Sequence, residues 1–599
     1  MDGARYHQSG QLDRAAGLYE KVLRRQPNHP DALHLLGLIA SNGEEHDRAL
    51  DLISRAIETN SENAAYHNSL GTVLLALDRA GDAESSFRRA LALNPAYAEA
   101  HNNLGNALQD LGRPEESLSS YNSAVQLNPQ YAEAYCNCGR ALQALGERKE
   151  AVAAFRRALE LKPDYVKAHR SLGEVLWELG QMEDARASFE RALALAPEDE
   201  DTCVALAAFF ERSSKLEDGL AMAEQALRSR PGYVQAHVLA AKCEKRLGRE
   251  REAIDRLEAL NLENLDILGT DVALYELAAL RDRTGDYERA YTAYKKANEL
   301  AAETPQWKRV DKNRFPDLIV DLKTAFTAEW LASWTPPIPF LERQPVFLIG
   351  FPRSGTTLLD QILDAHPSLH TMEEKPAIDV VKQRVREMPG GYPNALAVMT
   401  AEDVAGLRQI YFAEVASYMD GVPDGILVDK HPLNIMDVGL IHRLFPEAKL
   451  LLALRHPCDV VLSGFMQYFE PNMAMVQFGS LPDTARFYQG VMGLWQQYEA
   501  TLPVSVHPSR YEDLVAEFEP QTRRILDFLE VPWDDAILAY AERAKGRRIA
   551  TPSYHQVVQP IYSRSVSRWL NYREPMEQVL PILRPFIDAF GYGENGSIE

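Results

Sequence analysis

The chain has 599 residues and a mass of 67.3 kDa, which exceeds what one hydrophobic core supports and predicts several domains. Apolar residues make up 46% and charged residues 25% of the chain, as in ordinary globular proteins. The net charge of −22 argues against a dedicated nucleic-acid binder, so any anionic ligand needs a locally basic pocket.

The sequence carries no pattern of a secreted or membrane protein. The N-terminal segment lacks a basic-then-apolar signal, and no stretch approaches about 18 uninterrupted apolar residues. The five cysteines are few and odd in number, and they do not form two pairs at metal-binding spacing. We therefore expect a cytoplasmic protein without a membrane segment, a disulfide framework or a bound metal.

The first half of the chain repeats itself with a period of 34 residues. One repeat position holds Pro27, Ser61, Pro95, Pro129, Pro163, Pro197 and Pro231, and another holds Gly37, Gly71, Gly105, Gly139, Gly173, Ala207 and Ala241. Small residues let two antiparallel helices approach closely, and an aromatic residue such as Phe87 or Tyr121 fills the space beside them. The pattern resembles the tetratricopeptide repeat (TPR), which implies an all-α superhelix over residues 1–300.

The TPR resemblance also implies a partner. Arrays of this family bind an extended peptide or a partner protein along their groove, and assembly into a homo-oligomer is another role open to them. In the family, the positions of Asn103 and Asn137 lie on the groove side, where amides can hydrogen-bond a peptide backbone. The alternative interpretation is that both residues are ordinary solvated helix positions, and the sequence slightly favours this alternative.

The repeat pattern stops after about residue 300, and the chemistry is expected beyond it. Residues 301–344 read as a helical and proline-rich linker, because Pro336, Pro337 and Pro339 exclude helix near its end. Apolar runs at 346–350, 425–430, 449–455 and 503–511 then alternate with amphipathic segments. This alternation is typical of a parallel α/β sheet and predicts an α/β domain over residues 345–599.

The stretch "PVFLIGFPRSGTTLLDQIL", residues 345–363, is the most informative part of this domain. It reads as a buried strand, a turn bounded by Gly350 and Gly355, and a helix, as in a P-loop, but Thr356 replaces the lysine and Arg353 stands inside the loop. The backbone N–H groups at the helix start and the helix dipole favour an anion. The sequence therefore predicts a P-loop-like turn that binds phosphate without a metal.

Two segments, "FPRSGTTLLDQIL" and "LLALRHPCDVVLSGF", resemble the nucleotide-binding motifs of the sulfotransferases, with a spacing close to that of the tyrosylprotein sulfotransferases. The resemblance covers roughly residues 345–590. It implies 3′-phosphoadenosine 5′-phosphosulfate (PAPS) as the sulfuryl donor, with one group of residues on the 5′-phosphosulfate, a pair on the 3′-phosphate and three further nucleotide contacts. The residues on the 5′-phosphosulfate are Arg353, Ser354, Gly355, Thr356 and Thr357. The pair on the 3′-phosphate is Arg455 and Ser463, and the further nucleotide contacts are Tyr511, Ser553 and Arg568.

The resemblance also assigns catalytic roles. Sulfuryl transfer needs a base that takes the proton of the acceptor hydroxyl and a cation near the leaving oxygen. Glu374 falls at the catalytic glutamate position of the family, and Lys430, together with Arg353, matches the cations that stabilise the transferring group. His431 lies near the place where cytosolic sulfotransferases keep a catalytic histidine and is the second candidate base.

The sequence thus predicts a PAPS-dependent sulfotransferase whose acceptor is a protein tyrosine recruited by the TPR array. One alternative is a carbohydrate or small-molecule sulfotransferase in which the array serves oligomerisation or localisation. Another is a catalytically inactive scaffold, which Gln467 keeps open because the tyrosylprotein enzymes have an arginine at that position. The presence of Arg353, Lys430 and Glu374 counts against the scaffold.

Overall fold

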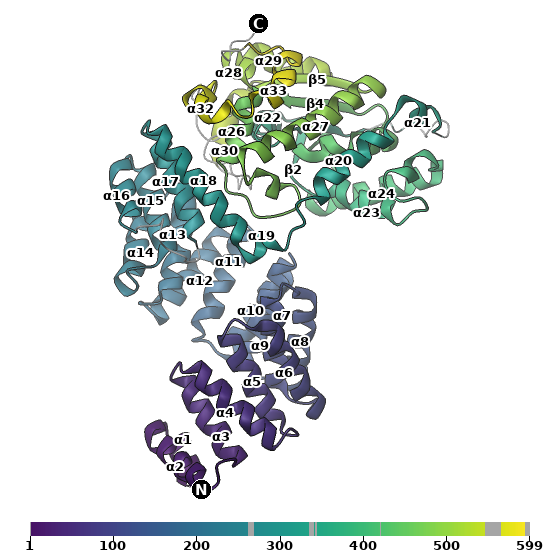
Figure 1. Cartoon of the computed structure of the whole chain (residues 1–599). Helices are drawn as coiled ribbons and strands as arrows, with labels where there is room; N and C mark the ends of the chain where they lie inside the picture. The colour runs from purple at the N-terminus through teal and green to yellow at the C-terminus, as the bar shows by residue number, and fades with distance from the viewer. Residues whose placement is uncertain are drawn as a thin grey trace. The chain divides into compact units, whose positions relative to one another are not determined.

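The computed structural model of the chain describes residues 2–260, 269–334, 341, 344–419, 421–545 and 565–593. These residues form two compact units, Met1–Leu247 and Gly248–Glu599. The predicted fold class is confirmed, since all-helical repeats are followed by a parallel α/β domain (Figure 1). Among the described residues, no helix is both long and apolar enough to cross a lipid bilayer.

The N-terminal unit consists of helical pairs in which consecutive helices lie side by side (Figure 1). Its helices are α1 (Asp2–Gln8), α2 (Leu12–Arg25), α3 (Pro30–Asn42), α4 (His46–Thr59), α5 (Ala64–Ala76), α6 (Ala80–Leu93), α7 (Ala98–Asp110), α8 (Pro114–Leu127), α9 (Ala132–Ala144), α10 (Arg148–Leu161), α11 (Val166–Glu178), α12 (Met182–Leu195), α13 (Glu200–Arg212), α14 (Leu216–Ser229) and α15 (Val234–Arg246).

The repeat glycines lie where the two helices of a pair cross. A Cβ atom on Gly105 would come within 2.4 Å of the ring of Tyr121, and a Cβ atom on Gly139 would come within 2.7 Å of the ring of Phe155. Tyr121 and Phe155 are fully buried. The glycines therefore make room for the aromatic side chains that fill each crossing.

Asn103 and Asn137 contact other asparagines of the array. The amide of Asn103 donates to Asn68 Oδ1 at 3.1 Å, and the amide of Asn137 donates to Asn102 Oδ1 at 2.9 Å and Asn106 Oδ1 at 3.3 Å. Asn137 is only 2% exposed, so it is not a solvated helix position. These amides connect neighbouring repeats to one another.

The second unit begins with helices that precede the sheet. They are α16 (Glu250–Glu258), α17 (Thr270–Arg283), α18 (Tyr287–Glu303), α19 (Pro305–Lys308), α20 (Arg314–Ala325) and α21 (Ala328–Ala332). The segment predicted as a linker contributes to the α/β domain: Phe315 of α20 packs edge-on against Phe487, and Phe326 is fully buried against Tyr498. Pro336, Pro337 and Pro339 lie outside the described residues.

The sheet has five parallel strands in the order β2-β3-β1-β4-β5. The strands are β1 (Val346–Gly350), β2 (Leu369–Glu373), β3 (Ile426–Lys430), β4 (Lys449–Leu454) and β5 (Ser505–Arg510). Four of them coincide with the apolar runs of the sequence. The edge strand β2 was not predicted, because only two of the five residues in its sequence, "LHTME", are apolar.

Helices cover both faces of the sheet. Val346 and Leu348 of β1 pack in one core with α22 and α29, whereas Phe347 on the other face contacts Tyr411 and Phe445. The helices are α22 (Thr356–Asp364), α23 (Ala377–Arg386), α24 (Ala401–Tyr418), α25 (Val438–Leu444), α26 (Pro457–Phe465), α27 (Leu481–Thr501), α28 (Tyr511–Ala516), α29 (Phe518–Leu529), α30 (Tyr540–Lys545), α32 (Arg573–Met576) and α33 (Leu580–Ala589). Short 3-10 helices span Asn394–Ala397, Pro432–Asp437, Met475–Phe478, Asp535–Ala539 and Arg568–Tyr572.

Candidate active site

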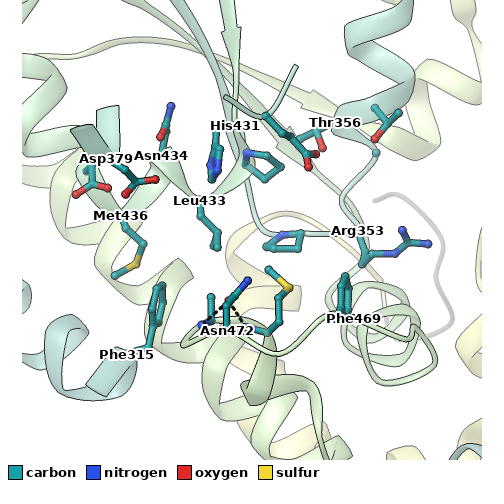
Figure 2. A pocket seen from close by; sticks show the side chains of 18 of the residues that line it. Phe315, Arg353, Thr356, Asp379, His431, Leu433, Asn434, Met436, Phe469 and Asn472 are labelled. Carbon is teal, nitrogen blue, oxygen red and sulfur yellow. Dashed lines mark hydrogen bonds between the residues drawn. The ribbon is translucent and has the colours of Figure 1, made fainter. Parts of the chain in front are cut away.

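A cavity of about 550 Å³ lies at the carboxyl ends of the strands. Its walls come from the segments that follow all five strands, from α20, from residues 469–475, and from Tyr540 and Ser565. Figure 2 shows the labelled side chains around this space, with Arg353 on one side, Asp379 on the other and His431 between them. Parallel α/β sheets commonly bind ligands at this edge, where connections leave neighbouring strands in opposite directions. Here those strands are β1 and β4, which pair directly.

The loop between β1 and α22 forms one end of the cavity. Arg353 and Gly355 have positive φ angles of 76° and 96°, and a Cβ atom on Gly355 would lie 2.7 Å from the ring of Tyr511. The turn therefore depends on the glycine and directs the chain into α22, whose first residues Thr356 and Thr357 line the cavity. The N-terminus of this helix presents backbone N–H groups and a partial positive charge to an anion.

Two arginines meet at this loop. Arg353 Nε donates to Ser463 Oγ at 3.2 Å, although the two residues are 110 positions apart in the sequence. Arg455, which follows β4, donates to the carbonyl of Arg353 at 3.3 Å and to the carbonyl of Ser565, and its guanidinium lies 5.1 Å from the ring centre of Tyr511. The structure thus brings together residues from three separate segments: Arg353, the pair Arg455 and Ser463, and Tyr511. We call this part of the cavity the donor end.

Lys430 and Glu374 meet where β3 and β2 end. The register of these strands pairs Glu373 with Lys430, and the next residue, Glu374, donates its backbone N–H to the carbonyl of Lys430 at 2.7 Å. Lys430 Nζ lies 2.9 Å from Glu374 Oε1 and 3.3 Å from Glu373 Oε1, and the lysine side chain is fully buried. Glu374 lines the cavity. Lys430 does not line it, but lies directly behind Glu374 and contacts its carboxylate.

The environment of Lys430 keeps it charged. Burial by itself lowers the pKa of Lys430, but the carboxylates of Asp360, Glu374 and Glu373 more than offset that effect, so the pKa is raised above its ordinary value. A buried ammonium group surrounded by carboxylates is therefore fixed beside Glu374. It is a strong hydrogen-bond donor to negative charge that develops nearby.

His431 follows Lys430 directly and also lines the cavity. Burial lowers its pKa, an effect that Asp379 and Glu374 oppose only in part. Its Nδ1 atom is buried and has no hydrogen-bond partner among the described residues. A neutral imidazole at this position can accept a proton from a hydroxyl group in the cavity.

The end of the cavity away from the arginines holds a network that the sequence did not indicate. Lys382 Nζ contacts Asp379 at 2.8 Å and Asp437 at 2.7 Å, and Asp437 also accepts a hydrogen bond from Tyr392 at 2.8 Å. Asp379 and Lys382 are spaced three residues apart on α23, which is an ordinary pattern for an exposed helix. Only their position at the cavity distinguishes them, so no local signal could have identified them. We call this part the acceptor end.

Apolar side chains complete the walls. Phe315 and Leu318 come from α20, and the others come from the segments after β3 and α26; they are Leu433, Met436, Phe469, Met473 and Met475. None of these residues was predicted from the sequence, because hydrophobic residues in helices and loops are far more often part of a core than of a cavity wall.

Five predicted residues lie outside the cavity wall or the described chain, and Lys430, which contacts Glu374 from behind the wall, is one of them. Ser354 is buried beneath the loop, and Ser463 contacts Arg353 instead of lining the cavity. Arg568 forms an ion pair with Asp282 at 2.7 Å. Ser553 lies outside the described residues. The amide of Gln467 donates to the carbonyl of Tyr468 at 3.0 Å and does not line the cavity.

Comparisons with known proteins agree with this arrangement. The family profile described as "Sulfotransferase family" matches residues 345–535. Profiles described as "Tetratricopeptide repeat" match residues 96–164, 138–200 and 272–304, and one described as "Anaphase-promoting complex, cyclosome, subunit 3" matches residues 8–90.

Three relatives illustrate the range of similarity. An uncharacterized protein of Aquifex aeolicus is 28% identical over 333 residues, which are 54% of this chain and 42% of that protein, so the chain matches less than half the length of this relative. Protein-tyrosine sulfotransferase 1 of Danio rerio is 28% identical over 260 residues, 41% of this chain and 72% of that protein.

Protein-tyrosine sulfotransferase A of Caenorhabditis elegans is 28% identical over 277 residues, 42% of this chain and 68% of that protein. These similarities and the family profiles confirm both resemblances inferred from the sequence. The chain consists of tetratricopeptide repeats followed by a domain of the sulfotransferase family.

Proposed function

We propose that this chain transfers the sulfuryl group of PAPS to the hydroxyl group of a protein tyrosine, and that the TPR array recruits the acceptor or a partner. The observation that supports this proposal best is that one cavity is lined both by the loop that carries Arg353, next to Arg455, and by the carboxylate of Glu374, which is held beside the buried Lys430.

The donor end suits a ligand with two separate anionic groups. The N-terminus of α22 and Arg353 offer one anion-binding position, and Arg455 offers a second position directly after the neighbouring strand β4. Guanidinium groups and helix N-termini are the usual partners of phosphate and sulfate oxygens. PAPS supplies a sulfuryl group on a phosphosulfate and carries a second phosphate at the 3′ position, which fits two such positions.

The catalytic groups lie beside this donor end. Glu374, with its side chain 37% exposed, can take the proton of an acceptor hydroxyl. Lys430 and Arg353 can stabilise the negative charge that accumulates on the leaving oxygen. His431 is the second candidate base, because it lines the same cavity and its lowered pKa favours the neutral form.

The tyrosine acceptor is supported by the walls of the acceptor end and by the relatives. Phe315 and Met436, which lie on the side of Asp379 in Figure 2, give this end apolar surfaces on which an aromatic ring can pack. Several similar proteins are protein-tyrosine sulfotransferases, and the repeats belong to a family of peptide-binding and protein-binding arrays.

The proposal is tested by calorimetric titration of the full chain with 3′-phosphoadenosine 5′-phosphate, the desulfated product, and with ATP and ADP. We expect selective binding of the 3′-phosphorylated nucleotide. Arg353→Ala should weaken this binding by about 10- to 100-fold, because it removes a charge-assisted contact to the anion. Arg486→Ala, which removes an exposed ion pair with Asp483 on α27, is the matched control and should leave binding unchanged.

Equal binding of ATP, or no binding of any of the three nucleotides, would contradict the proposed donor. If the donor is confirmed, transfer of labelled sulfate to tyrosine peptides is compared with transfer to sugars. Transfer to sugars alone would show that the acceptor assignment is wrong while the donor assignment holds.

A further inference from the structure

The last helical pair of the repeat array, α17 and α18, is part of the compact unit that contains the sheet. Asn298 of α18 is 2% exposed, and its amide donates to the carbonyl of Phe465 at 3.1 Å. Phe465 is the last residue of α26, the helix that carries Ser463. Tyr275 of α17 donates its hydroxyl to Asn298 Oδ1 at 2.8 Å and fixes the orientation of this amide.

A second set of contacts connects the same helical pair to residues 565–572. Asp282, at the end of α17, accepts from Arg568 Nη2 at 2.7 Å and from the hydroxyl of Tyr572. Both partners of the ion pair are largely buried, with side chains 16% exposed for Asp282 and 28% exposed for Arg568. The ring of Tyr572 also packs edge-on against Tyr287 of α18 at 5.3 Å. Asp282 is therefore the anchor of this segment on the repeat side.

The other side of residues 565–572 faces the donor end. The backbone N–H groups of Ser567 and Trp569 donate to the two carboxylate oxygens of Asp459 on α26, each at 2.8 Å. Ser565 lines the cavity, and its carbonyl accepts a hydrogen bond from Arg455. The backbone that orients Arg455 is thus held between α26 on one side and α17 on the other.

From these contacts we infer that Asp282 of the last repeat is a positioning residue for the donor end of the cavity. It holds Arg568 and Tyr572, these hold the segment that begins at Ser565, and Ser565 helps to orient Arg455. In this arrangement Arg568 affects the cavity through its ion pair with Asp282 and through the backbone of residues 565–572, without contacting the nucleotide. The expected effect of Asp282 on nucleotide binding and kinetics rests on the proposed function. Its expected effect on the order of residues 565–572 does not depend on that function.

The structural consequence is tested first, by hydrogen exchange on the full chain without nucleotide. Asp282→Ala should raise the exchange rates of the Ser567 and Trp569 amides by about tenfold or more, because local protection falls when a buried ion pair is removed. Arg283→Ala is the matched control: it removes the neighbouring ion pair of α17, with Glu250, which does not touch residues 565–572. Unchanged exchange in Asp282→Ala would overturn the inference, whatever ligand the cavity binds.

The functional consequence is tested by binding of 3′-phosphoadenosine 5′-phosphate and by kinetics. Asp282→Ala should weaken nucleotide binding about tenfold and raise KM for PAPS without an equal change in kcat, whereas Arg283→Ala should stay within twofold of the unmodified protein. Wild-type nucleotide binding in a folded Asp282→Ala variant would overturn the inference. Absence of nucleotide binding in the unmodified protein would instead refute the proposed function.

A charge reversal separates positioning from direct contact. In the double variant Asp282→Arg and Arg568→Asp, the ion pair can form again with its charges exchanged, so binding should recover to within about threefold of the unmodified protein, as expected for coupled neighbours. If Arg568→Ala abolishes binding and the double variant does not restore it, Arg568 contacts the nucleotide directly and the inference is wrong. If Asp282→Ala fails to fold, Tyr572→Phe replaces it in the exchange and binding experiments, because this variant removes only the hydroxyl that donates to Asp282.

Discussion

Glu374 is held in its place by both its backbone and its side chain. Its φ angle is 47°, in the left-handed region that non-glycine residues seldom occupy, and its backbone N–H is bonded to the carbonyl of Lys430. Residues held in such conformations cluster at functional sites, because surrounding contacts must compensate for the strain. Here the contact with Lys430 Nζ fixes the carboxylate at the cavity.

Replacing this carboxylate tests its role as the base. Glu374→Gln keeps the size of the side chain but removes its basicity, so kcat should fall by about 10²- to 10⁴-fold while binding of 3′-phosphoadenosine 5′-phosphate stays within a few-fold. Glu373→Gln is the matched control, because Glu373 also contacts Lys430 but does not line the cavity. Normal transfer by Glu374→Gln together with lost transfer by His431→Ala would assign the base to His431.

Strand β3 directs neighbouring residues to opposite faces of the sheet. Lys430 faces the carboxylates beside the cavity, whereas Asp429 is fully buried on the other face, where it accepts hydrogen bonds from Tyr411 at 2.9 Å and from Asn434 at 3.5 Å. Burial raises the pKa of Asp429 to about 7. Strand β3 thus carries Lys430, which stays charged, next to Asp429, whose protonated form is stabilised in the folded state.

This preference predicts a pH dependence of stability. Because the folded-state pKa of Asp429 is near 7 and the ordinary value is 3.8, the folded protein binds the proton more tightly, so the free energy of unfolding decreases as pH rises from about 4 to 7. Asp429→Asn lacks this titration. Between pH 6 and pH 8, we expect the variant to gain about 1 kcal/mol relative to the unmodified protein.

Urea unfolding of both proteins at the two pH values measures this difference, and the range stays above the pI of about 5.2, near which solubility is low. Other titrating groups, including Asp360, contribute equally to both proteins and cancel. The same stability difference at pH 6 and pH 8 would show that Asp429 is ionised throughout this range.

At the scale of the whole molecule, the repeats up to α15 and the cavity belong to different compact units, whereas the last repeat pair, α17 and α18, belongs to the unit that contains the cavity. The helices up to α15 form the unit Met1–Leu247, and every residue that lines the cavity lies between 315 and 565. A local defect in the first unit should therefore change its stability without changing nucleotide binding.

Gly105→Ala provides such a defect. The added Cβ atom would lie 2.4 Å from the ring of Tyr121, which is fully buried and hydrogen-bonded through its hydroxyl to Asn106, so the ring cannot move away freely. We expect a loss of about 1–3 kcal/mol of stability in thermal unfolding and an unchanged Kd for 3′-phosphoadenosine 5′-phosphate. Gly81→Ala is the control, because no atom lies within 4 Å of its added Cβ and alanine favours helix.

A Gly105→Ala protein as stable as the unmodified one would show that the repeat glycine is not required by packing. Weakened nucleotide binding by the same protein would show instead that the first unit affects the cavity, contrary to the expectation of independent units.

The sequence by itself determined the features that depend on nearby residues. The repeat period was readable because each helical pair packs mainly against its neighbours along the chain, so the same glycine and aromatic positions recur in each unit. The loop around Arg353 was readable for a similar reason, since its strand, turn and helix are consecutive in the sequence. The order of the motifs then indicated Arg455, Glu374 and Lys430 by resemblance.

Only the tertiary structure decided which distant residues meet. The contacts Arg353–Ser463, Arg455–Ser565 and Asp282–Arg568 join positions 110, 110 and 286 residues apart. They depend on the strand order β2-β3-β1-β4-β5 and on the packing of α17 and α20, which no local pattern encodes. The edge strand β2, the Phe315 wall and the Lys382 network were missed for this reason, because their sequences resemble ordinary surface or core segments and only long-range packing places them at the cavity.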